Sequence, residues 1–531
     1  MSACPLAGMK VLVTAYDLEQ NEHRGIAVYS KALIRCLHQA GAKVWLLTEF
    51  DNSLEEGGLQ RLPKSTRKMI QSAKLLNDLA NGQLEKELTW LERKLALARV
   101  IRLWSKRTKL AFEIARRPRH YRVRNLNCIR LSELYDSPYP RVERLSYLQD
   151  LEGIVCAKGV FFATQLAARM KQLRPVEIDL RNFDALVTTC PLNILPKHLP
   201  IFVQTVHDLI PLEYVAHNED PLMFSHRLQA CLPARRLFVS DSTASKYNNH
   251  IQRLEEKDHQ KITRLIEDRE SVIVQPPSLR FPSWLREDPE HVNDLKPTSY
   301  LLRKDYTPFD EADQKKSDEA TEKKLDDEDL PPMDEPIRKR LKGLRPFRYF
   351  LFNSSIEARK NLLFLAQAYV ESDLSSIGIQ LCVTGKLKGD DYSNAVEEIV
   401  QHEPGILLTG YIDESSKLDL YLNAMGLLSP SLVEGFGIPV LDAACLGMPT
   451  LASDCESHCE IKSMLDFNEI VFTINTLKSR DWASAMGAVS GLNGTLWKRA
   501  AEERRRRIGR YEKLSAGFYD RFQQDLYEIL R

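Results

Sequence analysis

Two adjacent cations and two carboxylates mark the C-terminal half of the chain. Arg359 and Lys360 follow a run that reads as a strand and precede a run that reads as a helix. Because the free N–H groups at the start of a helix bind anions, this position suits a diphosphate. Glu434 lies in a predicted loop with two glycines, and Asp442 follows eight residues later in a predicted helix. Carboxylates placed in this way can accept hydrogen bonds from sugar hydroxyls.

A histidine ends a predicted strand in the N-terminal half. His207 follows the apolar run 201–206 and could position or polarise a hydroxyl or phosphate group of a substrate. Each of these residues also has an ordinary structural interpretation, since a lone histidine is more often structural. Arg359 and Lys360 alone could cap a surface helix, and Asp442 alone could be an exposed helix acid. The combined pattern is more specific than any of its members.

The elements that would carry these residues read as two α/β halves. In the first half, apolar runs at 10–16 and 43–48 predict strands on either side of a helix that Gly25 opens and Gly41 ends. Such a β-α-β unit favours a parallel sheet with helices on both faces. A final helix is expected near 516–530. The other predicted strands are 185–188, 201–206, 237–240, 272–274, 348–352, 379–384, 406–409, 427–429 and 450–453.

Composition and charge exclude several classes of function. The chain has 531 residues, with 74 Lys and Arg against 73 Asp and Glu, for a net charge of +1. These totals exclude a uniformly basic nucleic-acid binder and an acidic solvated chain. No run approaches the ~18 apolar residues of a membrane-spanning helix, so none is expected. The start of the chain lacks the basic-then-apolar layout of a secretion signal, and we expect a cytoplasmic protein.

Two stretches of opposite charge lie outside the α/β pattern. Nine Lys and Arg and one acid fall between Arg102 and Arg124, a net charge of +8, within the leucine-rich stretch 51–150 that reads as helical. This basic stretch reads as a solvated helical face, or as a surface for anionic lipid headgroups or a lipid-diphosphate substrate, with a nucleic-acid surface as the least favoured alternative. Twelve acids and four lysines between Tyr306 and Pro336 give −8. Such a segment cannot bury enough apolar surface to offset its ordering entropy, and we predict a mobile linker.

One close group of metal-ligand residue types is present. Cys455, His458 and Cys459 lie within a few residues of one another. A zinc site of this kind needs a second pair of ligands at a matching spacing, and none follows. The group therefore reads as a loop with free thiols, and no metal site is expected.

Three segments together resemble glycosyltransferase family 4. Residues 430–443 match the family pattern P-S-x-x-E-G-F-G-x-P-x-x-E-A, except that Asp442 replaces the second glutamate. The E-x-R-K-N run at 357–361 and the H-D-L-I-P-L run at 207–212 are similar to the same family, especially to its polysaccharide and lipopolysaccharide branches. The R-G-I run at 24–26 resembles the glycine loop of the family, with an arginine in place of one glycine.

The resemblance implies the GT-B fold, an α/β fold of two facing Rossmann-like doubly wound domains. It would give an N-terminal acceptor-side domain at 1–280, which contains the helical basic insertion 51–150. The acidic linker 281–344 would follow, and then the nucleotide-sugar domain 345–515. The C-terminal helix 516–531 would cross back to the N-terminal domain. The substrate cleft would lie between the two domains.

The same resemblance implies an enzyme, a retaining hexosyltransferase that uses a nucleotide sugar and needs no metal or other cofactor. The acceptor would be a glycan or a lipid-linked molecule in surface-polysaccharide biosynthesis. The H-D-L-I-P-L run favours mannose from GDP-mannose as the donor. A further expected partner is an anionic membrane, contacted at its inner face through residues 102–124, whereas no nucleic-acid partner is expected.

The resemblance also assigns a role to each motif residue. Glu434 would contact the hydroxyls of the donor sugar, and Asp442, one methylene shorter than glutamate, would bind the ribose. Arg359 and Lys360 would hold the diphosphate and stabilise the leaving charge. His207 would sit at the reacting sugar as a catalytic residue together with Glu434. The remaining donor-binding residues would be Gly25, Gly435, Phe436 and Gly437.

Other functions fit the same features. One is a nucleotide-sugar epimerase or a phosphorylase on the same fold, and a phosphorylase would need inorganic phosphate as its acceptor. Another is a non-catalytic scaffold that binds nucleotide sugars, which Asp442 and the missing second glycine favour. A dehydrogenase is disfavoured, because no G-x-G-x-x-G follows the first predicted strand.

Overall fold

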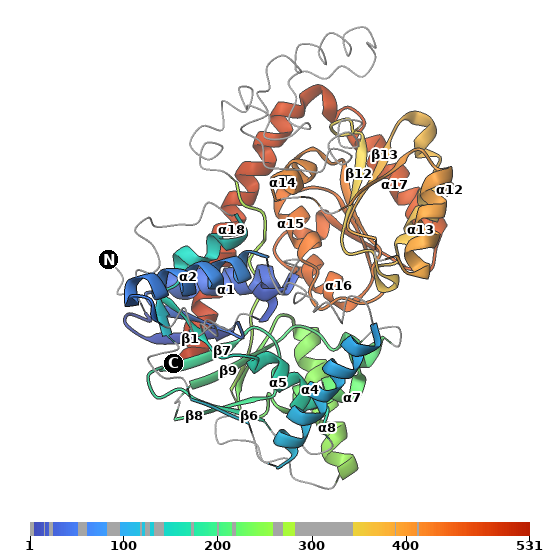
Figure 1. Ribbon diagram of the computed structural model, residues 1–531. Coiled ribbons are helices and arrows are strands. Elements are labelled where there is room, and N and C mark those ends of the chain that lie inside the picture. Colours follow the sequence, from blue (N-terminus) through green and yellow to red (C-terminus); the bar gives the residue numbers. More distant parts are fainter. Residues whose placement is uncertain are drawn as a thin grey trace. The chain divides into compact units, whose positions relative to one another are not determined.

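The chain divides into two compact units, which are treated separately below. The N-terminal unit comprises Met1–Pro276 and Phe518–Arg531, and the C-terminal unit comprises Pro277–Gly517. The acidic segment 306–336 lies outside the described residues. The computed structural model (Figure 1) describes residues 5–14, 16–20, 25–50, 61–81, 96–116, 119–122, 128–131, 143–170, 175–198, 201–214, 219–258, 269–281, 344–387, 389–410, 412 and 414–531.

An eight-stranded sheet forms the centre of the N-terminal unit. Its order is β11-β10-β9-β7-β1-β2-β5-β4, and all neighbours are parallel except β4 and β5. From β1 the chain extends the sheet through β2 and β5, and then returns to β7 on the other side of β1. The strands are β1 (Lys10–Thr14), β2 (Lys43–Thr48), β4 (Cys128–Arg130), β5 (Gly153–Cys156), β7 (Ala185–Thr188), β9 (Ile201–Val206), β10 (Arg235–Phe238) and β11 (Glu270–Val272).

Helices and a second, three-stranded sheet complete this unit. The small sheet has the order β3-β6-β8, with β3 (His120–Arg122), β6 (Val176–Asp179) and β8 (Ile194–Lys197). The helices are η1 (Tyr16–Glu19), α1 (Gly25–Gln39), α2 (Lys64–Asn81), α4 (Ala96–Arg116), η5 (Glu143–Asp150), α5 (Val160–Ala168), α6 (Ile210–Glu213), α7 (Pro221–Gln229) and α8 (Asp241–Asp258).

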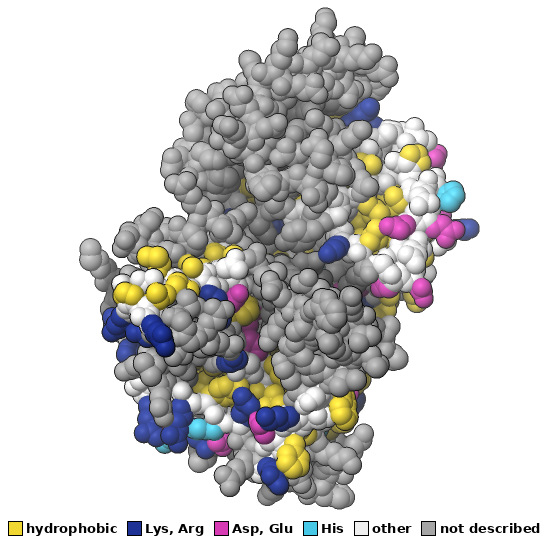
Figure 2. All heavy atoms as spheres, in the orientation of Figure 1, with side chains coloured by type: hydrophobic (Ala, Val, Ile, Leu, Met, Phe, Trp, Pro, Cys, Tyr) yellow, Lys and Arg dark blue, Asp and Glu magenta, His cyan; other side chains and the backbone are white. Residues whose placement is uncertain are grey.

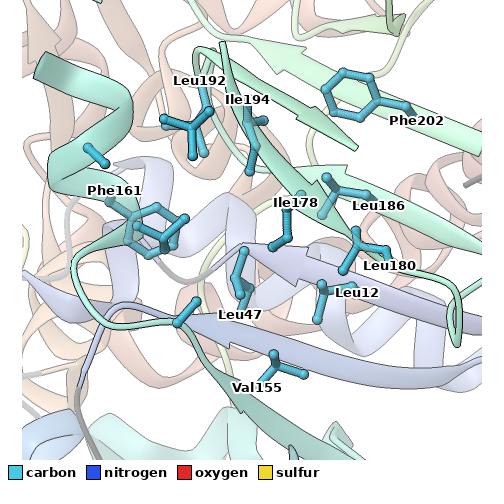
Figure 3. Packing of buried hydrophobic residues seen from close by; sticks show 14 of the residues in the cluster. Leu12, Leu47, Val155, Phe161, Ile178, Leu180, Leu186, Leu192, Ile194 and Phe202 are labelled. Atoms are coloured by element: carbon cyan, nitrogen blue, oxygen red, sulfur yellow. The ribbon is translucent and has the colours of Figure 1, made fainter. Parts of the chain in front are cut away.

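Apolar side chains from the first strands and from α5 form one core of the N-terminal unit. Leu12, Leu47 and Val155 come from the neighbouring strands β1, β2 and β5, and they pack in one cluster with Phe161 of α5 (Figure 3). All four are fully buried. Burial of a side chain of this size contributes roughly 1.5–3 kcal/mol relative to an exposed one. The central strands that end at the polar residues discussed below are therefore firmly held.

The helical insertion predicted at 51–150 contains strands as well as helices. It forms α2 and α4 as expected, but also β3, which pairs with β6, and β4, which pairs with β5. Ile114 of α4 is fully buried in the core cluster, and Leu110 and Ala111 pack against it. The stretch is thus partly built into the sheets of the N-terminal unit. The leucine-rich run 84–95 lies outside the described residues.

A six-stranded parallel sheet forms the centre of the C-terminal unit. Its order is β14-β13-β12-β15-β16-β17, which is the Rossmann order 3-2-1-4-5-6 when the strands are counted along this unit. The α/β class with doubly wound parallel sheets is thereby confirmed. The strands are β12 (Tyr349–Asn353), β13 (Gln380–Thr384), β14 (Ile406–Gly410), β15 (Gly426–Ser429), β16 (Thr450–Ser453) and β17 (Val471–Ile474).

The helices of the C-terminal unit follow its strands in the usual alternation. As expected, a helix begins at Leu362, directly after the two cations. None of the helices in the described part of the chain is both long and apolar enough to cross a membrane. They are η8 (Ala358–Lys360), α12 (Leu362–Glu371), η9 (Leu374–Ile377), α13 (Asp391–His402), α14 (Glu414–Asn423), α15 (Ile438–Leu446), α16 (Glu456–Ser463), η10 (Phe467–Glu469), α17 (Ser479–Asn493), η11 (Leu496–Arg499) and α18 (Ala500–Leu530).

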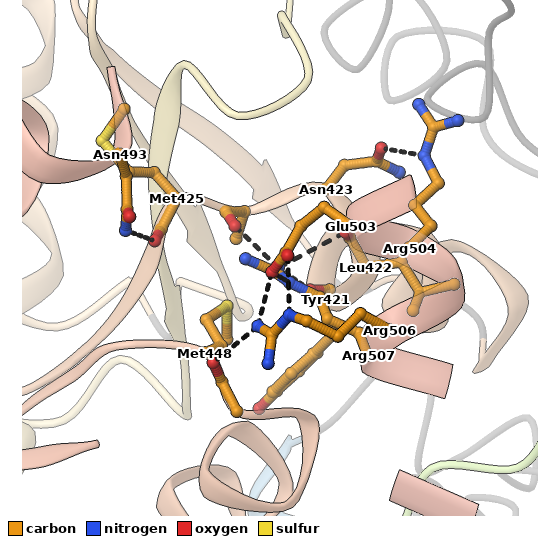
Figure 4. A network of polar contacts seen from close by, with 12 residues as sticks. Tyr421, Leu422, Asn423, Met425, Met448, Asn493, Glu503, Arg504, Arg506 and Arg507 are labelled. Carbon is orange, nitrogen blue, oxygen red and sulfur yellow. Dashed lines mark hydrogen bonds and ion pairs between the residues drawn. The ribbon is translucent and has the colours of Figure 1, made fainter. Parts of the chain in front are cut away.

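The last helix is longer than expected, because α18 begins at Ala500 rather than near Ala516. Its first half carries buried arginines, which a hydropathy pattern reads as exposed. Arg507 is fully buried and donates from Nη1 to the carbonyls of Tyr421, Leu422 and Ala424 at 2.8–3.3 Å (Figure 4). These carbonyls end α14, where a cation is favourable. The guanidinium thus fastens α18 to α14.

Candidate functional site

Two loops meet at the point where the strand order of the C-terminal sheet reverses, between β12 and β15. Arg359 and Lys360 lie in η8, in the loop after β12, and Glu434 lies in the loop after β15. The Leu432 N–H donates to the Arg359 carbonyl at 2.8 Å, which joins the two loops. Open α/β sheets bind ligands at such a reversal, beyond the carboxyl ends of the strands. The structure therefore brings these three predicted residues together at a favourable place.

The side chains of the three residues form a charged cluster. Lys360 Nζ donates to Glu434 Oε1, which also accepts from Ser431 Oγ at 2.7 Å. Arg359 Nη1 lies 3.7 Å from Glu434 Oε2, while its Nε donates to Glu357 at 3.0 Å. Arg359 Nη1 is buried and has no hydrogen-bond partner within the described part of the chain. Arg359 therefore has a buried donor beside Glu434 that no hydrogen bond satisfies.

The cluster fixes the charge of its members. Burial would raise the pKa of Glu434, but Lys360 and Arg359 outweigh burial and lower this pKa to about 2. Burial lowers the pKa of Lys360, and Glu434 opposes that change. Glu434 is therefore ionised at neutral pH. An ionised carboxylate can only accept hydrogen bonds, as required of a group that holds hydroxyls.

The glycines after Glu434 allow a tight loop. Gly437 has φ 104°, a left-handed value, and a Cβ added there would lie 3.0 Å from His458 Cδ2. A residue other than glycine would be strained at this position. Ser457 Oγ donates to the carbonyls of Glu434 and Gly435 at 2.7 and 3.2 Å, and Phe436 is buried. Contacts from α16 thus hold the loop that carries Glu434.

His458 lies beneath this loop, and its supporting role was missed from the sequence. The ring is fully buried, with Nδ1 2.9 Å from Ser453 Oγ and Nε2 3.4 Å from Ser429 Oγ. Burial lowers the pKa of His458 to about 4, so the ring is neutral at neutral pH. No group of three or more His, Cys, Asp or Glu side chains that could hold a metal ion lies among the residues that the structure describes.

Asp442 lies apart from this charged cluster. Its Oδ1 accepts from the Ser278 N–H at 2.6 Å and from Tyr511 OH at 3.0 Å, and its Oδ2 accepts from Ser278 Oγ at 2.5 Å. The side chain is only 2% exposed. Burial raises the pKa of Asp442, which Lys417 and Ser278 oppose. The contacts of Asp442 are therefore made within the chain, and its role in binding ribose stays a prediction.

His207 of the N-terminal unit lies at the carboxyl end of β9. Its Nε2 is 2.7 Å from the Thr189 carbonyl, and because a carbonyl can only accept, Nε2 carries the proton. Burial lowers the pKa of His207, which Thr189 and Asp208 oppose. The rings of His207 and Tyr29 lie nearly perpendicular to each other, with 4.8 Å between centroids. A neutral His207 thus keeps Nδ1 as a hydrogen-bond acceptor.

Thr189 links His207 to a carboxylate that the sequence did not single out. Its N–H donates to Thr14 Oγ1 at 3.0 Å, and its hydroxyl donates to Asp17 Oδ2 at 3.0 Å. Burial raises the pKa of Asp17 to about 6, against opposing effects of Thr189 and Arg227. Asp17 follows β1 and Thr189 follows β7, and the order of the large sheet reverses between these two strands. A single Asp in a 3-10 helix of four residues carries no sequence period, so no pattern could identify it.

Gly25, predicted to approach the donor, is the first residue of α1 and is exposed. The preceding loop, including Arg24, lies outside the described residues. The proximity of Gly25 to a diphosphate therefore stays a prediction. Of the predicted residues, Gly25 and His207 belong to the N-terminal unit, whereas Arg359, Lys360 and Glu434 gather in the C-terminal unit.

Comparison with known sequences identifies two similarities. Residues 334–485 match the family described as "Glycosyl transferases group 1", a range that contains the charged cluster. The chain is 30% identical over 115 residues to the O-antigen chain mannosyltransferase B of Escherichia coli, which is 21% of this chain and 30% of that protein. The chain thus matches about a third of the length of that relative.

Solved structures with a similar arrangement are more distant. Sucrose-phosphate synthase from Thermosynechococcus elongatus is 13% identical, with 97% of this chain and 98% of that chain covered and a TM-score of 0.48. A glycosyltransferase from Rickettsia africae is 13% identical, with 99% of both chains covered and a TM-score of 0.44.

Proposed function

We propose that this chain, whose residues 334–485 match the glycosyl transferases group 1 family, is a retaining hexosyltransferase. It moves a hexose from a nucleotide sugar to a glycan or lipid-linked acceptor in surface-polysaccharide biosynthesis. The observation that carries the proposal is the cluster of Arg359, Lys360 and Glu434 at the reversal of a Rossmann-ordered sheet. Mannose from GDP-mannose is the proposed donor, which the similarity to an O-antigen mannosyltransferase supports.

The cluster can supply the electrostatics of this reaction. The unused Arg359 Nη1 donor and the remaining Lys360 donors would bind the diphosphate and stabilise the negative charge that develops as it leaves. Ionised Glu434 would accept hydrogen bonds from the hydroxyls of the donor sugar. Gly25 would let the first loop approach the diphosphate, and Gly435, Phe436 and Gly437 would line the donor site. No step in this scheme requires a metal.

His207 would act near the reacting sugar. Its proton lies on Nε2 and points at Thr189, so Nδ1 is free to accept a hydrogen bond from a substrate hydroxyl. Since burial lowers its pKa, the ring would stay neutral while the diphosphate departs. A neutral acceptor is suited to orienting a hydroxyl, and it does not compete with the cations for the phosphate.

The basic face of α4 would bring the enzyme to an anionic membrane on the cytoplasmic side. Trp104 and Phe112 are 68% and 59% exposed, and the Arg116 guanidinium lies 4.5 Å from the Phe112 ring centroid. Lys109 is also exposed. In the lower part of Figure 2, where Figure 1 draws α4, Lys and Arg side chains accompany exposed hydrophobic ones. Aromatic and cationic side chains together favour anionic lipid over a merely solvated face.

A panel of radiolabelled nucleotide sugars tests the enzyme proposal. The purified chain should transfer or hydrolyse sugar from at least one donor, with GDP-mannose the expected one. Phosphate-dependent release of sugar 1-phosphate would indicate the phosphorylase alternative, and conversion of the donor sugar into its epimer would indicate the epimerase. Nucleotide-sugar binding without any turnover would support the scaffold. Absence of both binding and turnover across the panel would refute the proposal.

A further inference from the structure

We infer that Asp442 is a positioning residue that fastens both ends of the C-terminal unit to the helix behind the Glu434 loop, and that it does not bind the donor ribose. Ser278 follows Pro277, where the C-terminal unit begins, and Tyr511 lies in α18 shortly before Gly517, where this unit ends. Asp442 accepts hydrogen bonds from both residues. The inference rests on the proposed function only for the ribose alternative.

The contacts leave little of the carboxylate for a ligand. Three donors lie 2.5–3.0 Å from its two oxygens, two on Oδ1 and one on Oδ2. The side chain is more than nine-tenths buried, at 2% exposure. Ribose hydroxyls would have to reach the one lone pair that the three donors leave on the buried Oδ2, and aspartate is one methylene shorter than the glutamate of the family pattern.

The surrounding contacts tie the same two segments together independently of Asp442. The Leu279 N–H donates to Tyr511 OH at 2.7 Å. The rings of Phe281 and Tyr511 meet edge to face, with 5.2 Å between centroids. Leu279, Phe281 and Tyr511 are all buried. Asp442 thus belongs to a packed joint, in which Tyr511 OH accepts from one segment and donates to the carboxylate.

The position of Asp442 gives the joint a consequence for the donor site. α15 begins at Ile438, directly after the loop of Glu434, Gly435 and Gly437. The helix that carries this loop is therefore fixed to the two segments where the chain enters and leaves the C-terminal unit. Residues at such segments often control conformational steps that limit kcat. Loss of the joint should slow turnover while leaving the donor contacts themselves intact.

The test compares Asp442→Asn with Ser278→Ala and Tyr511→Phe, each of which removes one part of the joint. Each variant should lower Tm by about 2–4 °C per lost hydrogen bond, and the Asp442→Asn/Tyr511→Phe pair should be non-additive. Affinity for GDP and UDP, measured by calorimetry, should stay within twofold of wild type in all three. Their kcat at a temperature well below Tm should fall at least threefold.

The ribose alternative predicts a different pattern. It would hold if Asp442→Asn weakened nucleotide binding tenfold or more while Ser278→Ala and Tyr511→Phe bound as wild type. An additive Tm change in the double variant, or unchanged kcat in all three, would also overturn the inference. If wild type bound no nucleotide, the proposed function would fail, but the Tm coupling would still decide whether the joint exists.

Discussion

The charge balance around Glu434 is the most consequential feature at the scale of single residues. A buried carboxylate with a pKa of about 2 stays ionised only because Lys360 and Arg359 lie beside it. The E-x-R-K-N and E-G-F-G runs could be predicted to meet, because both follow parallel strands. Two of their supports could not, since His458 and Ser457 are isolated polar residues with no period that a sequence pattern could detect.

Removal of either member of the central pair should impair transfer. We expect Glu434→Ala and Lys360→Ala each to lower the transfer rate at least tenfold, about 1.4 kcal/mol of barrier. The first loses hydroxyl contacts and the second loses diphosphate stabilisation. Rates are measured with the donor identified in the panel, and Lys478→Ala, an exposed lysine in the same unit, is the matched control. Wild-type rates in both variants would show that the site is elsewhere.

Asp17 should make the protein less stable as pH rises. Its pKa in the folded protein is raised to about 6 by burial, above the ordinary value of about 3.9. A raised pKa gives a stabilising contribution that is complete below about pH 4 and is lost as pH rises through 6. Asp17→Asn should therefore stabilise the protein at pH 7.5 by about 1–3 kcal/mol, with little effect at pH 4. Urea unfolding at both pH values measures this, and equal effects at both would contradict it.

At the scale of elements, hydropathy predicted most strands but misread segments whose partners lie far along the chain. The runs predicted at 237–240 and 272–274 form strands two residues earlier, as β10 and β11. Strands β5, β6, β8 and β17 have four residues each, too few for a clear period. α18 was predicted only in its second half because buried arginines read as solvent-facing.

The first half of α18 should depend on its buried guanidinium. Arg507→Leu removes the donor to three carbonyls that end α14 and leaves them buried without that partner. We expect a loss of about 3 kcal/mol or more in the free energy of unfolding, because groups left buried without a partner are costly. Lys513→Met, at an exposed position of the same helix, should change it by less than about 0.5 kcal/mol. Equal effects of the two changes would contradict this role.

At the scale of the whole molecule, the structure describes most of the basic segment 102–124 but none of the acidic segment 306–336. The sequence could predict both from counting, and the acidic block lies outside the described residues. The basic block could be predicted to be helical, but not that β3 and β4 join it to the sheets, because their partners β6 and β5 come later in the chain. That attachment leaves one face of α4 outward.

Membrane binding should depend on this outward face. Liposomes with anionic lipid should sediment the protein at about 0.05 M salt and much less at 0.5 M, because exposed charges are screened over ~8 Å already at 0.15 M. Trp104→Ser with Phe112→Ser should weaken binding at low salt. Met69→Ser, at a hydrophobic residue of α2 that is 71% exposed, is the matched control. If binding does not change with salt concentration, or if the protein does not bind liposomes at all, the membrane proposal is wrong and α4 simply presents a solvated face.

The chain runs from the N-terminal unit into the C-terminal unit and returns at Phe518. This path determines what proteolytic cleavage between the two units would produce. Cleavage anywhere in 282–343 would produce two fragments, neither of which holds a complete unit. The first would keep Ser278 and Phe281 but lack the end of α18, where Phe522 is buried against Tyr29. The second would keep that end but lack its partners. Each half carries the missing piece of the other, so the two fragments, expressed separately with a tag on one, should co-purify as a reconstituted protein.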